Sequence, residues 1–141
     1  MSAPGVPEGY NSVSPYLVVP GVAQLLEFVK EVFGAVERFR MPNADGQIMH
    51  AEVTIGDTVV MMGEGPHEGE VHPGYLHVYV PDADATYARA LKAGATSIRE
   101  PADQFYGDRN AGVRDASGNT WWIATRVREV SPEELAGHSG A

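Results

Sequence analysis

The chain has 141 residues, no cysteine and a formal net charge of −9, from 19 acidic and 10 basic side chains. The length suits one domain, and 43% apolar residues are enough to bury a core. The absence of cysteine excludes disulfides, thiolate metal sites and cysteine nucleophiles. The acidic charge argues against nucleic acid or an anionic membrane as a partner.

No apolar run reaches the roughly 20 residues that a membrane-spanning helix needs. The opening Met1-Ser2-Ala3-Pro4-Gly5 lacks the basic and apolar regions of a signal peptide. We therefore expect a cytoplasmic protein.

The first half of the chain predicts one helix among four strands. A strand at Val13–Val19 is ended by Pro20-Gly21. Apolar residues then recur at helical spacing from Val22, and Gly34 ends that helix. Three further strands are expected at Val36–Arg40, Gln47–Ile55 and Thr58–Met62.

The second half repeats this order after a polar connector at 63–74. Asp82 is a favourable N-cap for a helix that Gly94 ends, and Ser131 is a favourable N-cap for a short terminal helix. The expected elements are a strand at Tyr75–Val80, a helix at Ala83–Ala93, and strands at Thr96–Arg99, Arg109–Arg114 and Thr120–Thr125.

An internal repeat explains this order. A shift of 61 residues, which carries Val19 onto Val80, also carries Ser14 onto Tyr75 and Tyr16 onto His77. We predict an α+β fold of two βαβββ modules, at about 12–64 and 74–127. They form a single domain over 1–130, followed by a short terminal helix and tail at 131–141.

Three segments carry a family resemblance: Phe33-Gly34-Ala35, Ala93-Gly94-Ala95, and 113–121, which contains an Asp-x-x-Gly-Asn turn. With the two modules, they make the chain similar to the vicinal oxygen chelate superfamily, which includes glyoxalase I, extradiol dioxygenases, fosfomycin resistance proteins and bleomycin-binding proteins. The resemblance implies sheets curled into an open barrel, helices outside and a small-molecule pocket between the modules. It also implies a homodimer, often with modules paired between two chains.

The same resemblance implies where metal-using members hold a divalent ion. The corresponding positions here are Ser14, Met61, Tyr75 and Trp122. Hydroxyl, thioether and indole groups are poor ligands for such ions. We therefore expect no metal and no cofactor at these positions.

An indole at position 122 predicts an apolar, aromatic pocket instead. Arg109 is expected at its mouth, bound either to a ligand carboxylate or to Asp108, Asp115 or Glu100. Trp121 should point to the helices. The expected ligand-binding residues are Ser14, Tyr16, Met61, Tyr75, His77, Tyr79, Arg109 and Trp122, unless these side chains simply fill a core.

His50 and His77 lie within strands and are the candidate catalytic residues. Beside Glu52, His50 can act as a general base, although strand histidines are also often structural. A relocated metal on these two histidines with Glu52 or Glu64 is a further alternative. His67, His72 and His138 are expected to be solvated loop residues.

The sequence thus favours a metal-free protein that sequesters an aromatic or apolar natural product, as drug-resistance members of the superfamily do. The alternative is a glyoxalase-like lyase or isomerase that uses a relocated metal or His77 as base. A third possibility is a dimer scaffold without a ligand.

Overall fold

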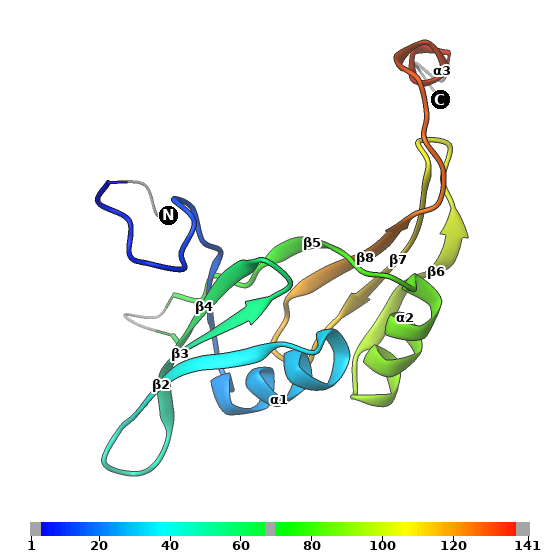
Figure 1. Cartoon of the computed structure of the whole chain (residues 1–141). Helices are drawn as coiled ribbons and strands as arrows, with labels where there is room; N and C mark the ends of the chain where they lie inside the picture. The colour runs from blue at the N-terminus through cyan, green and yellow to red at the C-terminus, as the bar shows by residue number, and fades with distance from the viewer. Residues whose placement is uncertain (1–3, 67–69, 138–141) are drawn as a thin grey trace.

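The computed structural model describes residues 4–66 and 70–137, which form two four-stranded mixed sheets and three helices (Figure 1). The strand orders are β1-β4-β3-β2 and β5-β8-β7-β6. The elements of the first half are β1 (Tyr16–Val19), α1 (Val22–Phe33), β2 (Val36–Pro42), β3 (Ile48–Ile55) and β4 (Thr58–Glu64). Those of the second half are β5 (Tyr75–Tyr79), α2 (Ala83–Lys92), β6 (Thr96–Asp103), β7 (Asp108–Arg114), β8 (Thr120–Arg126) and α3 (Pro132–Ala136).

The two sheets have the same topology, so the predicted α+β fold of two βαβββ modules is confirmed. In the first sheet β1 runs parallel to β4 and Tyr16 lies opposite Met61. In the second sheet β5 runs parallel to β8 and His77 lies opposite Trp122. Both pairs are related by the same shift of 61 residues that the sequence indicated.

Two strands differ from their predicted bounds by three or more residues, and the other strands differ by one or two. β1 begins at Tyr16 instead of Val13, and Pro15 immediately before it has no N–H to donate to a ladder. β6 continues past Arg99 to Asp103. It includes Pro101 because an edge strand tolerates a residue that cannot donate to a neighbour.

The core lies between the sheets and their helices. α1 packs against β3, α2 against β7, and the helices pack against each other. Trp121 is fully buried, and its ring centroid lies 4.9 Å from that of Phe33 on α1. Trp121 therefore points to the helices as expected and joins the two modules in one core.

The Asp-x-x-Gly-Asn turn is part of this core. One carboxylate oxygen of buried Asp115 accepts hydrogen bonds from the backbone N–H groups of Ser117 and Asn119. The other accepts from the Asn119 side chain and from Trp121 Nε1. Asn119 Oδ1 in turn accepts from the Gly74 N–H at 2.7 Å. The motif therefore fixes the start of β8 and of β5.

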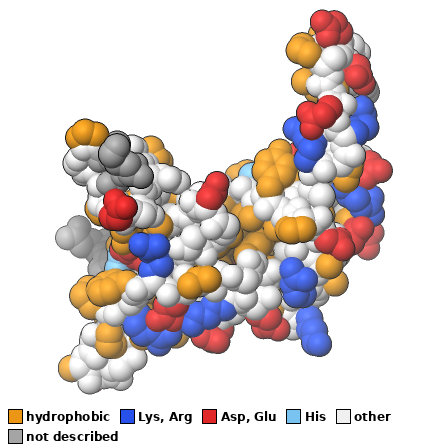
Figure 2. Space-filling model, viewed as in Figure 1, with side chains coloured by type: hydrophobic (Ala, Val, Ile, Leu, Met, Phe, Trp, Pro, Cys, Tyr) orange, Lys and Arg blue, Asp and Glu red, His pale blue; other side chains and the backbone are white. Residues whose placement is uncertain are grey.

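Each sheet leaves one face without helices. We call the face of the first sheet opposite α1 open face one; it carries Tyr16, Phe39, His50, Glu52 and Met61. We call the face of the second sheet opposite α2 open face two; it carries His77, Tyr79, Arg99, Gly112 and Trp122. Figure 2 shows the molecule hollowed on the side away from α1 and α2, with hydrophobic side chains in the hollow.

The helix ends follow the predicted signals. Gly34 ends α1 with φ of 65°, a left-handed conformation that favours glycine. The Asp82 carboxylate accepts from the Ala85 N–H at the start of α2, and Ser131 and Glu134 form a capping box at α3. No helix within 4–66 and 70–137 is long and apolar enough to cross a membrane.

Candidate functional site

Four side chains form a continuous hydrogen-bonded chain on open face one. His50 and Glu52 are two residues apart on β3, so both point to the same face. The Tyr16 hydroxyl lies 3.0 Å from His50 Nδ1, and His50 Nε2 lies 3.0 Å from Glu52 Oε2. Tyr10, from the segment before β1, donates its hydroxyl to Glu52 Oε1. His50 and Glu52 therefore lie side by side on one face, the arrangement in which His50 could act as a general base.

The hydrogen bonds change the acidity of this group. The bond with His50, followed by the bond from Tyr10, lowers the pKa of the Glu52 carboxyl below its usual value. The same Glu52 carboxylate raises the pKa of the Tyr10 hydroxyl. The first shift favours the charged carboxylate and the second keeps the Tyr10 hydroxyl protonated as its donor, so Glu52 is the anionic member of the chain.

A groove runs between the N-terminal segment and open face one. Tyr10, Ser14, Glu52 and Met61 line it together. Ser14 and Met61, two of the expected ligand-binding residues, are therefore neighbours of the His50–Glu52 pair. Tyr10 was not singled out from the sequence, because its strand-free segment gave no register from which to place it.

Trp122 dominates open face two. Its indole lies over Gly112, where an added Cβ would stand 2.5 Å from the ring carbon Cζ3. The Arg99 guanidinium lies 4.9 Å from the indole centroid, and the Tyr75 ring lies at 6.4 Å. Trp122 is thus held between a glycine backbone and a cation, an arrangement in which the ring and the positive charge attract each other.

Arg99 is a residue that the sequence analysis missed. Ser97 is opposite Val113 and faces the helices, and simple alternation would put Arg99 on that side too. A bulge between Ser97 and Arg99 brings Arg99 opposite Gly112 instead. There its Nη2 donates to Asn110 Oδ1 at 2.6 Å.

His77 and Tyr79 share open face two, as their alternation predicts. Their ring centroids are 4.9 Å apart. The Tyr79 hydroxyl donates to Oδ2 of buried Asp108 at 2.8 Å, and that bond raises the pKa of Tyr79. Arg126 makes an ion pair with the same carboxylate. Among the described residues His77 has no hydrogen-bond partner, so no carboxylate orients its ring.

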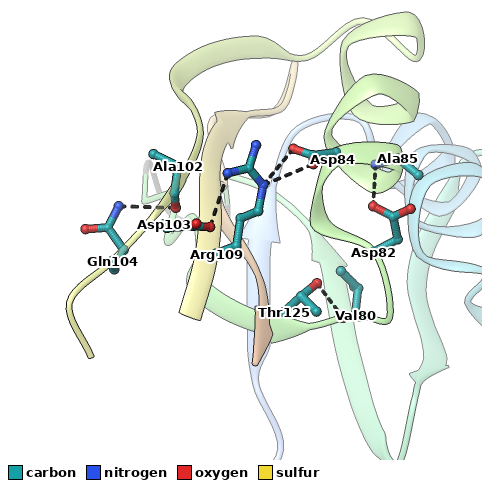
Figure 3. Close-up of polar contacts among 9 residues, drawn as sticks. All are labelled: Val80, Asp82, Asp84, Ala85, Ala102, Asp103, Gln104, Arg109 and Thr125. Carbon is teal, nitrogen blue, oxygen red and sulfur yellow. Dashed lines mark hydrogen bonds and ion pairs between the residues drawn. The ribbon is translucent and has the colours of Figure 1, made fainter. Parts of the chain in front are cut away.

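Arg109 lies on the opposite face of the second sheet. Its guanidinium pairs with Asp84 on α2 at 3.0 Å and with Asp103 on β6 at 3.2 Å (Figure 3). The expected position at the pocket mouth is therefore wrong, and so are the three salt-bridge partners expected for it. Successive residues of a strand point to opposite faces of the sheet. Asn110 points to open face two, where it bonds Arg99, so the preceding Arg109 points to the helix side.

The expected ligand-binding residues other than Arg109 therefore fall into two groups, one in each module. Ser14, Tyr16 and Met61 belong to the first module, and Tyr75, His77, Tyr79 and Trp122 to the second. Within one chain the two groups lie on separate sheets that are not closed into a single barrel.

The three histidines that the structure describes do not gather into a metal centre. His50 is on β3 and His77 on β5, in different sheets. Across 4–66 and 70–137, no group of three or more His, Asp or Glu side chains is placed to hold a metal ion. His72 is exposed and lies 3.2 Å from Glu70, while His67 and His138 are outside the described residues.

Known proteins share this arrangement of modules. The sequence profile of the Glyoxalase/Bleomycin resistance protein/Dioxygenase superfamily matches residues 10–123. The uncharacterized protein Mb0911c of Mycobacterium bovis is 36% identical over 135 residues, which span 88% of this chain and 89% of that protein.

Two solved structures share the fold. TioX from Micromonospora sp. ML1 superposes with a TM-score of 0.67 and 24% identity, over 86% of this chain and 100% of that one. FosX, a genomically encoded fosfomycin resistance protein from Listeria monocytogenes complexed with Mn(II) and sulfate ion, superposes with a TM-score of 0.64 and 13% identity. That match covers 89% of this chain and 97% of FosX.

Proposed function

Since the chain belongs to the Glyoxalase/Bleomycin resistance protein/Dioxygenase superfamily, we propose that it binds an aromatic or otherwise apolar small molecule without a metal. One observation carries the proposal: a partly exposed indole, Trp122, stands on open face two, at a position where the family resemblance implies a ligand in metal-using members. Sequestration of a toxic natural product in the cytoplasm is the role that fits such a site.

The surroundings of Trp122 support a binding surface that is already in place before the ligand arrives. Gly112 beneath the ring and Arg99 beside it limit its motion. Aromatic rings supply large apolar contact area at small entropic cost. Arg99 adds a planar cation, which attracts an aromatic ring or a ligand carboxylate.

A metal at the family position does not fit the residues present. Ser14, Met61, Tyr75 and Trp122 offer a hydroxyl, a thioether, a phenol and an indole, none of them a good ligand for a divalent ion. FosX, by contrast, shares the fold and is complexed with Mn(II), so it is the side chains at these positions that argue against a metal here.

The complete pocket is proposed to need a second copy of the chain. In one chain several aromatic side chains of the open faces are exposed, among them Tyr75 at 77% and Tyr79 at 58%. Large uncovered apolar surface marks an interaction site. A symmetric dimer would cover open face two of one chain with open face one of the other and enclose the ligand between them.

Binding is testable with the neutral fluorescent probe 1-aminoanthracene and chelator-treated protein. We expect the parent to bind it, and Trp122→Ala to weaken binding at least tenfold in equilibrium dialysis. Tyr87→Phe, which changes a tyrosine that bonds Ser97 on the helix side, is the matched control. Equal affinity of Trp122→Ala and parent, or binding that requires added metal, would overturn the proposal.

The second candidate function is a glyoxalase-like lyase or isomerase. It is favoured by the hydrogen-bonded His50–Glu52 pair, which a passive binding surface does not require. Metal analysis of the purified protein distinguishes an enzyme that uses a relocated metal from one that uses His77 as base. A stoichiometric divalent ion that is lost in His50→Ala or His77→Ala would establish a metal enzyme and contradict the leading proposal.

A further inference from the structure

The hydrogen-bonded side chains on open face one follow the order of a catalytic triad: the Tyr16 phenol, the His50 imidazole and the Glu52 carboxylate. The phenol is the exposed member. We propose that Tyr16, His50 and Glu52 form a proton relay in which the Tyr16 oxygen exchanges a proton with a bound enol or 1,3-dicarbonyl compound. The inference rests on the proposed function in one respect, namely that open face one lines the ligand site.

The contacts fix the direction of the relay. Glu52 is an anionic acceptor, so His50 donates to it from Nε2, which leaves His50 Nδ1 unprotonated. The Tyr16 hydroxyl, 3.0 Å from Nδ1, is then the donor to His50. Proton transfer from Tyr16 to His50 gives a phenolate beside an imidazolium, and Glu52 stabilises that imidazolium.

The far end of the relay is closed and the near end is open. Each carboxylate oxygen of Glu52 already has a donor, His50 on one and Tyr10 on the other, and the Glu52 side chain is only 12% exposed. Tyr16 is 50% exposed. A ligand in the hollow therefore reaches the relay at the Tyr16 hydroxyl.

Gly63 leaves room for the Tyr16 phenol to pack against β4. A Cβ added at Gly63 would stand 3.2 Å from the Tyr16 oxygen, so the glycine lets the ring lie close over β4. Among the described residues Tyr16 makes its side-chain hydrogen bond only with His50. The Tyr16 oxygen can therefore accept a hydrogen bond from a ligand, and once its own proton has passed to His50 it can accept the ligand's proton.

Because the Tyr16 oxygen is the one group of the relay that a ligand reaches, the same atom must both remove and return the proton. The Tyr16 phenolate removes a proton from carbon, the C–H electron pair becomes the enolate, and the proton is returned to the enolate oxygen. The reverse sequence converts the enol to the ketone. No electron, water or other reactant is consumed, so the reaction is a tautomerisation.

The acidity of the ligand is also restricted. Proton transfer is efficient when the acidities of donor and acceptor are close. A phenol therefore matches an enol or a carbon between two carbonyl groups. A carbon beside a single carbonyl is far less acidic and would need a metal or a strong oxyanion site.

The first test reads the tautomer of His50 without any ligand. In ¹⁵N NMR of the full-length protein we expect His50 to be protonated at Nε2 and unprotonated at Nδ1. In Glu52→Gln the amide can donate to Nε2, so the tautomer should reverse. Protonation of parental His50 at Nδ1 would overturn the relay, whatever the result of the 1-aminoanthracene experiment.

The second test follows ketonisation of the enol form of acetylacetone, whose acidic carbon lies between two carbonyl groups, by its ultraviolet absorbance. We expect acceleration by the parent, a fall to the background rate in Tyr16→Phe, and a fall of at least tenfold in kcat in Glu52→Gln. Tyr87→Phe should keep the parental rate. No acceleration by the parent, or full activity in Tyr16→Phe, would overturn the relay, while 1-aminoanthracene binding would still stand.

Discussion

Gly112 sets the position of the Trp122 indole on open face two. A methyl group at this buried position would stand 2.5 Å from the ring, well inside van der Waals contact. We expect Gly112→Ala to displace the indole and to lower the free energy of unfolding by about 1–3 kcal/mol, the usual cost of overpacking.

Urea unfolding and tryptophan emission would measure both effects of Gly112→Ala. Gly137→Ala is the matched control, because its added Cβ comes no closer than 3.4 Å to any neighbour. An unchanged emission spectrum and stability in Gly112→Ala would show that the indole lies elsewhere.

Asp115 is the residue on which the turn before β8 depends. Removal of its carboxylate deletes four hydrogen bonds and leaves the buried Trp121 N–H without its acceptor. We expect Asp115→Ala to cost about 2–4 kcal/mol in urea unfolding, since buried unsatisfied donors are expensive. Asp45→Ala, in the exposed turn between β2 and β3, should change stability by less than about 0.5 kcal/mol. Similar values for the two variants would contradict this role.

At the scale of elements, Glu37 ties β2 to α1. It pairs with Arg40 at 2.6 Å and with Lys30 of α1 at 2.7 Å. The hydrogen bonds from Arg40 and then Lys30 lower the pKa of Glu37 to about 2. A lowered pKa in the folded state stabilises the protein above the unfolded value near 4.5, and this stabilisation disappears as the pH falls towards 2.

We therefore expect Glu37→Gln to be less stable than the parent by about 1 kcal/mol at pH 6, an estimate reduced for the partial exposure of the pair. The difference should shrink between pH 4.5 and pH 2 in urea unfolding. Glu31→Gln, an exposed change on α1, is the control. A difference that stays constant over this pH range would contradict the ion-pair account.

The bulge in β6 determines which arginine contacts Trp122. It exchanges the faces of one strand, so Arg99 reaches Trp122 and the helix-facing Ser97 still bonds Tyr87. β7, in contrast, alternates regularly, which keeps Arg109 on the helix side. Arg99 and Arg109, on neighbouring strands of one sheet, thus lie on opposite faces of that sheet, and the register of each strand determines which face.

At the scale of the molecule, ligand binding should depend on association of two chains. We expect light scattering to give the mass of a dimer, and the affinity for 1-aminoanthracene to weaken when the protein is diluted below its dimer dissociation constant. The helical content in circular dichroism should stay constant over that dilution, which excludes unfolding as the cause. A monomer that binds with a concentration-independent affinity would contradict the shared pocket.

The element order, the duplication and the helix-facing side of Trp121 follow from the amino-acid sequence alone. Alternation in the strands and recurrence at about 3.6 residues in the helices are local patterns, and the 61-residue shift is visible by comparing the two halves of the sequence. The expectation that Ser14, Met61, Tyr75 and Trp122 hold no metal also rests on the chemistry of their side chains alone, and it stays a prediction.

Contacts between residues that are distant in the sequence depend on how the elements pack. Tyr10 reaches Glu52 from a segment without regular structure, Arg99 reaches Trp122 through a bulge, and Arg109 is held by Asp84 of a helix. Each of these contacts joins residues through sheet register or packing between elements. No local sequence pattern encodes such contacts, because their geometry depends on how distant segments are placed against each other.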